Sequence, residues 1–171
     1  MASIFQGTIN GLAGYIETAA QPARYREVYK ENCDRIYSLA FWMTDNELAA
    51  EQLSSNVFLR AFSASSEPTT EQIDRALLAE VRELYALGTL TLNKTAALEN
   101  MTRGNVKRIH LERAVVQLPA TERLIFLLHD VEGYEHQKIA RLLGLTENES
   151  CVGLHQARIR VRELIAEMQN S

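Results

Sequence analysis

Five polar side chains near the C-terminus have the chemistry needed to bind a nucleic acid: His155, Gln156, Arg158, Arg160 and Arg162. Guanidinium groups bind backbone phosphates, and histidine and glutamine can hydrogen-bond to base edges. Residues two apart in a helix point to different faces, so at most two of the three arginines can act together. The simpler interpretation is a solvated helix face whose positive charges balance nearby glutamates.

A helix-turn-helix is the element expected to position these side chains. Before it, Ile139, Ala140 and Leu143 share one face of a short helix that runs into Gly144, where the backbone can turn sharply. After the turn, Thr146-x-x-Glu149 has the form of a capping box that opens a second helix. The pattern predicts a helix-turn-helix over roughly residues 135–162, the unit that places a recognition helix in a DNA major groove.

The rest of the chain also has helical periodicity, and no run of alternating β-branched residues predicts a strand. We therefore expect an all-α protein. The predicted helices cover residues 23–43, 47–62, 71–87 and 106–116, a helix that starts near 121, and a last helix that extends to about 168.

Composition changes along the chain predict two small helical domains. Residues 1–22 form a lead-in whose order the sequence does not define, and residues 23–88 form the first domain. Residues 89–105, which contain Thr, Asn and Gly, are the predicted linker. Residues 106–171 form the second domain, which contains the helix-turn-helix.

Charge and cysteine content limit the possible functions. The net charge of −4 means that any DNA contact must come from a local basic stripe. The two cysteines, Cys33 and Cys151, match no metal or redox spacing, and we expect reduced thiols. No enzyme motif, cofactor motif, metal site or membrane span is apparent. The N-terminus has no basic start typical of a secretory signal, so a cytoplasmic location is expected.

Two separated stretches resemble a known family. Residues 25–40 and 56–62 are similar to the first conserved domain of bacterial RNA polymerase sigma factors of the sigma-70 family, extracytoplasmic-function type. Residues 114–123, 130–134, 138–140 and 142–145, followed by a tail at 155–164, are similar to that family's C-terminal domain. The two similarities occur in the family's order and at its usual separation.

The resemblance implies a region 2-like domain that docks on core RNA polymerase and helps to open the promoter, and a region 4-like domain that reads promoter DNA. An anti-sigma factor is a further expected partner, while catalysis, membrane insertion and a small-molecule substrate are not implied. The residues that the resemblance places at the polymerase are Glu51, Gln52, Leu53, Asn56, Phe58 and Arg60.

Departures from the family pattern support a second interpretation. The docking patch lacks most of the usual carboxylates, and Cys151, Gly153 and Gln156 stand where the recognition helix usually has basic residues. Together with the net charge of −4, these replacements favour a divergent sigma-like interaction module that binds an anti-sigma factor with little or no DNA binding.

Overall fold

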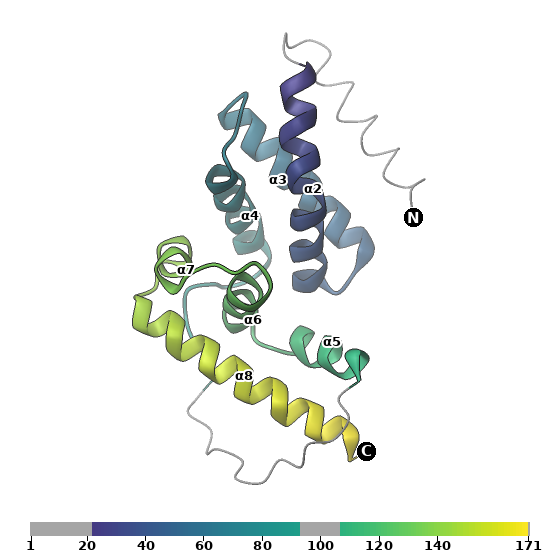
Figure 1. Cartoon of the computed structure of the whole chain (residues 1–171), viewed down its shortest axis with the longest axis vertical. Coiled ribbons are helices and arrows are strands. Elements are labelled where there is room, and N and C mark those ends of the chain that lie inside the picture. The colour runs from purple at the N-terminus through teal and green to yellow at the C-terminus, as the bar shows by residue number, and fades with distance from the viewer. Residues whose placement is uncertain (1–21, 93–106, 171) are drawn as a thin grey trace. The chain divides into compact units, whose positions relative to one another are not determined.

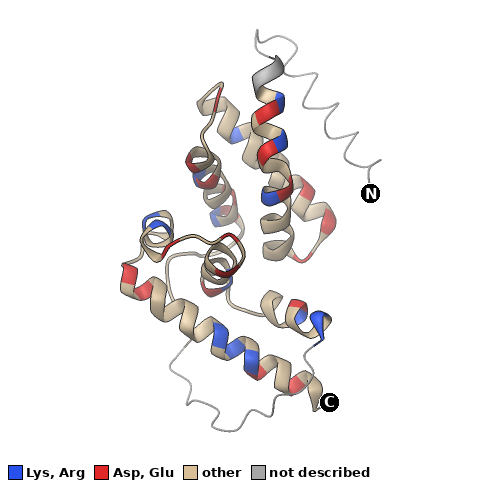
Figure 2. Ribbon diagram, viewed as in Figure 1, with Lys and Arg blue, Asp and Glu red and all other residues tan. Residues whose placement is uncertain are grey.

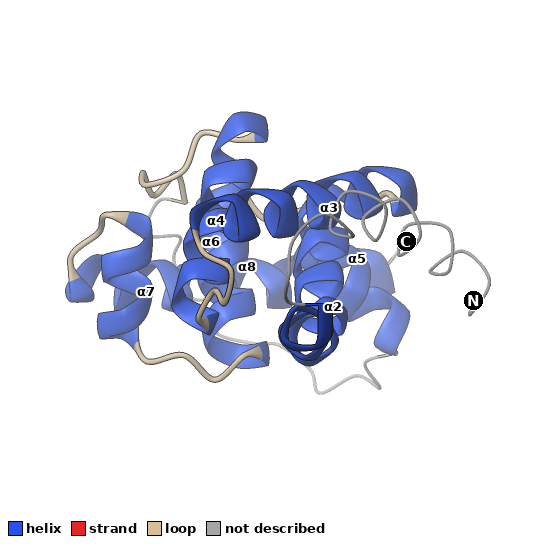
Figure 3. Ribbon diagram, turned by 90° about the horizontal axis from the view of Figure 1, so that it is seen from above, coloured by secondary structure: helices blue, strands red, loops and turns tan. Residues whose placement is uncertain are grey.

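The computed structural model describes residues 22–92 and 107–170, and within these ranges every regular element is a helix (Figures 1 and 3). The prediction of an all-α fold is confirmed. Among the described residues, none of the helices combines the length and the apolarity needed to cross a bilayer. The predicted lead-in, residues 1–22, lies outside the described residues except for Pro22, which begins the first described helix.

The described residues divide into two compact units, one of residues 22–41 and 46–80 and the other of residues 42–45, 81–92 and 107–170. One division falls after residue 80, near the end of a helix, and the sequence places the end of the first domain at residue 88. Most of the predicted linker, residues 93–105, lies outside the described residues.

The N-terminal unit contains α3 (Glu47–Ala64) and most of α2 (Pro22–Thr44) and α4 (Thr70–Leu84). Asn46 caps α3 by accepting a 2.9 Å hydrogen bond from the backbone N–H of Ala49. Aromatic side chains join α2 to α3, since the rings of Tyr29 and Phe58 lie 4.7 Å apart. A nearly buried ion pair, Arg35 Nη1 to Asp74 Oδ1 at 2.7 Å, joins α2 to α4.

The C-terminal unit is built on the long helix α8 (Glu147–Gln169), which contacts each of the shorter α-helices before it (Figure 1). These are α5 (Arg108–Val116), α6 (Ala120–Phe126) and α7 (His136–Leu143). The core between them consists of buried aliphatic side chains, among them Leu118, Leu124, Ile125, Leu127, Ile139, Leu154 and Leu164.

The helix that begins near Thr121 does not continue as a regular α-helix. It passes from α6 into one π-helical turn, η1 (Leu127–Val131), before the chain turns at Gly133, where φ is 71°. Such a turn changes the direction of the side chains that follow it. In this protein it places His129 and Asp130 beside α7 and α8.

Candidate nucleic-acid and protein interfaces

The helix-turn-helix predicted from the sequence is formed by α7 and α8. Gly144 ends α7 in the left-handed conformation with a φ of 74°, and its N–H donates to Ala140 O at 2.9 Å. Thr146 then opens α8 with both bonds of the predicted capping box: Glu149 N–H donates to Thr146 Oγ1 at 3.1 Å, and Thr146 N–H donates to Glu149 Oε2 at 2.7 Å. The hydrogen bonds from the Thr146 backbone and hydroxyl lower the pKa of Glu149.

One face of α8 presents a row of exposed side chains: Cys151, His155, Arg158 and Arg162. Their spacing of four, three and four residues aligns them along the helix. We call this row the α8 stripe, and Figure 2 shows the basic residues on this helix in blue. The structure thus brings together three of the five predicted DNA-binding residues.

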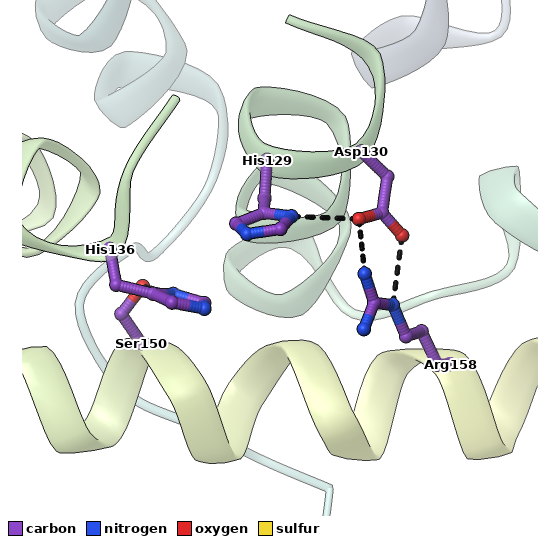
Figure 4. Close-up of polar contacts among 5 residues, drawn as sticks. All are labelled: His129, Asp130, His136, Ser150 and Arg158. Atoms are coloured by element: carbon purple, nitrogen blue, oxygen red, sulfur yellow. Dashed lines mark hydrogen bonds and ion pairs between the residues drawn. The ribbon is translucent and has the colours of Figure 1, made fainter. Parts of the chain in front are cut away.

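Arg158 is held by a carboxylate from η1. Its Nη2 donates to Asp130 Oδ1 at 2.6 Å and its Nε donates to Oδ2 at 3.0 Å, while His129 Nδ1 lies 2.8 Å from the same Oδ1 (Figure 4). Partial burial tends to raise the pKa of Asp130, but the bonds from Arg158 and His129 outweigh it and lower that pKa. Asp130 therefore stays ionised and neutralises part of the charge on the stripe.

The other two predicted DNA-binding residues lie off the stripe. Arg160 points to another side of α8, where its Nη1 bonds to Glu163 at 3.1 Å and to Glu167 at 3.2 Å. Gln156 is half-buried, and its Oε1 is covered without a hydrogen-bond partner among the described residues. Neither side chain can join His155, Arg158 and Arg162 on one surface without leaving its present position.

The structure gives a different reason for the glycine at position 153. The sequence counts it among the lost basic positions of the recognition helix, but the structure buries it on the core face of α8. A Cβ atom built on Gly153 would lie 2.7 Å from Ile125 Cδ1 and 2.8 Å from Leu90 Cδ2. Glycine stands there because the helix backbone is closely packed, so its presence says nothing about DNA affinity.

His136 begins α7 and connects the two helices of the motif. Its Nδ1 lies 3.0 Å from the hydroxyl of the fully buried Ser150 on α8, and its ring stacks on His129 with centroids 4.6 Å apart (Figure 4). Burial, and then the neighbouring His129, lowers the pKa of His136. The neutral imidazole is therefore the form that fits between α7 and α8.

In the N-terminal unit, α3 carries the residues that the family resemblance assigns to polymerase binding. Gln52 and Asn56 are exposed and Glu51 is half-exposed. Two exposed leucines share their side of the helix: Leu48 is 74% exposed and Leu59 is 42% exposed. We call Leu48, Gln52, Asn56 and Leu59 the α3 surface, and its apolar members are ones that the sequence analysis missed.

Leu53 and Phe58 correct the prediction for this surface. Leu53 is 4% exposed and Phe58 is 1% exposed, because both side chains fill the core of the N-terminal unit. They support the helix from within and are not available for direct contact with a partner. Arg60 is exposed, but its Nε bonds to Glu80 on α4 at 2.5 Å.

No group of three His, Cys, Asp or Glu side chains lies close enough to hold a metal ion in the described parts of the chain. The two cysteines are free thiols, Cys33 half-buried and Cys151 exposed on the α8 stripe.

Known proteins resemble the chain in sequence and in fold. Residues 108–161 match the family model described as Sigma-70, region 4, a range that begins with α5 and ends within α8. The chain is 24% identical over 166 residues to the ECF RNA polymerase sigma factor SigE of Mycolicibacterium smegmatis. That alignment covers 88% of this chain and 64% of the relative, so the chain spans less than two thirds of the relative's length.

The fold is similar to that of a solved sigma factor, RpoE of Bartonella quintana, whose structure was determined in complex with the anti-sigma factor NepR. The TM-score is 0.63 at 13% sequence identity, and the match covers 83% of this chain and 96% of that one. At this identity the likeness establishes a shared fold.

Proposed function

We propose that this chain is a sigma factor of the sigma-70 family, of the extracytoplasmic-function type, that binds core RNA polymerase and directs it to a specific promoter. The observation that carries the proposal is the capped helix-turn-helix of α7 and α8, most of which lies in the matched residues 108–161, with an exposed stripe of histidine and arginine along α8. A recognition helix needs this arrangement, because a row of side chains on one face can follow a groove of DNA.

The two units divide the work in this proposal. The α8 stripe contacts the promoter, with Arg158 and Arg162 at phosphates and His155 toward base edges. The α3 surface contacts core polymerase through Leu48 and Leu59, which lie at the two ends of the row, and through Gln52 and Asn56 between them. Protein interfaces combine apolar side chains of this kind with hydrogen-bonding groups.

An anti-sigma factor is the second protein partner that we propose, because the solved structure of similar fold was determined with one. The cytoplasm, where RNA polymerase works, is the proposed location. The phosphoryl-transfer chemistry of RNA synthesis belongs to the polymerase, and we assign no catalytic step to this chain.

Reconstitution with core polymerase tests the proposal. Purified chain and core enzyme are expected to co-elute as a complex, to retain a subset of genomic DNA fragments, and to produce transcripts from them. The affinity for those fragments should fall with rising salt, because phosphate contacts release counterions. The proposal is overturned if micromolar chain forms no complex with core polymerase and selects no DNA.

A further inference from the structure

Glu122 is a fully buried carboxylate on α6 with an unusual set of partners. It is 0% exposed, and its Oε1 accepts hydrogen bonds from the backbone N–H groups of Thr91 and Leu92, at 2.5 and 2.8 Å. The Thr91 hydroxyl approaches the same oxygen at 3.3 Å. A side chain on α6 therefore holds the backbone of a segment that lies about 30 residues earlier in the sequence.

The residue before this pair, Leu90, packs against the recognition helix. Its Cδ2 would lie 2.8 Å from a Cβ atom at Gly153, so the leucine side chain rests on the bare backbone of α8. Ile125 Cδ1, at 2.7 Å from the same point, forms the other wall. A Cβ atom at position 153 would force the ends of both side chains to shift.

A further contact comes from the turn that precedes the segment. Gly88 has a φ of 95°, a conformation that favours glycine, and a Cβ atom there would lie 3.3 Å from Leu143 O at the end of α7. The segment from Gly88 to Leu92 thus meets α7 at Gly88, α8 at Leu90, and α6 at Thr91 and Leu92.

The segment and the carboxylate depend on each other. A buried carboxylate is unfavourable unless donors satisfy its oxygens. Every hydrogen bond to Glu122 within the described chain comes from Thr91 or Leu92. Loss of the segment would leave the buried carboxyl group without these donors, so occupancy of this site is favoured over an empty one.

We propose that Glu122, Ile125 and Gly153 form a docking slot for an extended peptide with an apolar side chain followed by two free backbone N–H groups. The chain's own Leu90–Leu92 is its occupant. The C-terminal domain then includes Leu90–Leu92. This segment packs against the buried face of the recognition helix α8. This inference does not depend on the proposed function.

Amide hydrogen exchange in the full-length chain tests the slot. The Thr91 and Leu92 amides are expected to exchange as slowly as the Ala157 amide in α8. Glu122→Gln removes one acceptor oxygen and should accelerate exchange of both amides at least tenfold. Glu112→Gln is the matched control, since among the described residues Glu112 pairs with the exposed Arg108 on its own helix, and it should leave both rates unchanged. Exchange of Thr91 and Leu92 at unstructured-chain rates in the wild-type protein overturns the proposal.

A double-mutant cycle tests the packing half of the slot. Glycine to alanine inside a helix is normally stabilising by about 1 kcal/mol, but Gly153→Ala should stabilise the chain by less than that, because the ends of Leu90 and Ile125 must shift. Because Leu90→Ala vacates part of the space, Gly153→Ala should be more favourable in that background. Equal effects of Gly153→Ala in both backgrounds would show that Leu90 does not occupy the slot.

Discussion

Asp130 and Arg158 form a two-bond ion pair across 28 residues of sequence, with N–O distances of 2.6 and 3.0 Å. The pair joins η1 to the α8 stripe, so the arginine best placed in the middle of the stripe already has a carboxylate partner. A DNA phosphate must either share this guanidinium with Asp130 or compete with it. Asp130 thus reduces the net positive charge of the α8 stripe, the surface proposed to bind DNA.

Replacing Asp130 by Asn is expected to strengthen DNA binding. The substitution removes a negative charge beside the stripe and keeps an amide oxygen to orient Arg158. The charge of Arg158 is then no longer neutralised by a carboxylate, so the slope of log affinity against log salt should steepen by about 0.9. Fluorescence anisotropy with duplex DNA over a salt series measures the slope. A weaker complex with a shallower slope would mean that Asp130 positions Arg158 for DNA instead of competing for it.

The helices and their caps could be predicted from the sequence because they depend on local rules. The face formed by Ile139, Ala140 and Leu143, the turn at Gly144 and the Thr146–Glu149 box all rest on residues within a few positions of one another. Each was found where the sequence places it.

The candidate surfaces depend on contacts between distant residues, and the prediction was poorer there. The α3 sequence has apolar residues on several sides, so only packing of the whole unit shows that Phe58 is core while Leu48 and Leu59 are exposed. The same holds for Gly153, since the helix sequence contains no sign that Leu90 rests on it. In both cases, whether the residue is buried depends on side chains from another helix or segment.

Arg162 and Arg160 provide a matched pair for testing which side of α8 meets DNA. Arg162 is exposed on the stripe, and its replacement by Ala should reduce the salt slope of DNA binding by about one and weaken binding to all sequences alike. Arg160→Ala removes the same charge from the side that pairs with Glu163 and Glu167. It should leave the slope unchanged, and equal effects of the two variants would rule out the stripe as the contact surface.

Leu48 and Leu59 are expected to contribute to binding of core polymerase but little to stability. Burial of a leucine side chain is worth about 1.5–3 kcal/mol, so Leu48→Ser should weaken the complex about tenfold or more. Because Leu48 is 74% exposed in the free chain, the free energy of unfolding should change by no more than about 0.5 kcal/mol.

Phe58→Ala is the contrasting variant on the same helix. Its side chain is 1% exposed, and removal should lower the free energy of unfolding by about 3–5 kcal/mol. Titration calorimetry with core polymerase and urea unfolding followed by circular dichroism separate the two effects. Unchanged polymerase affinity in Leu48→Ser and Leu59→Ser would remove the α3 surface from the proposed interface.

His136 is expected to make the C-terminal domain less stable in mild acid. Its pKa is lowered below the ordinary 6.5 by burial and by His129, and the charges around it come from Asp130 on η1 and from Glu147 and Arg158 on α8. The unfolded chain therefore takes up a proton as the pH falls through about 6.5, while the folded chain resists it until a lower pH. The contribution of His136 to the free energy of unfolding is complete above pH 6.5 and is lost as the pH falls toward the lowered pKa.

Urea unfolding at pH 7.5 and 5.5 should show a larger loss of unfolding free energy in the wild type than in His136→Gln, whose amide can still bond to Ser150. The NMR titration of the His136 ring supplies a direct check, and a midpoint at or above 6.5 would contradict the prediction.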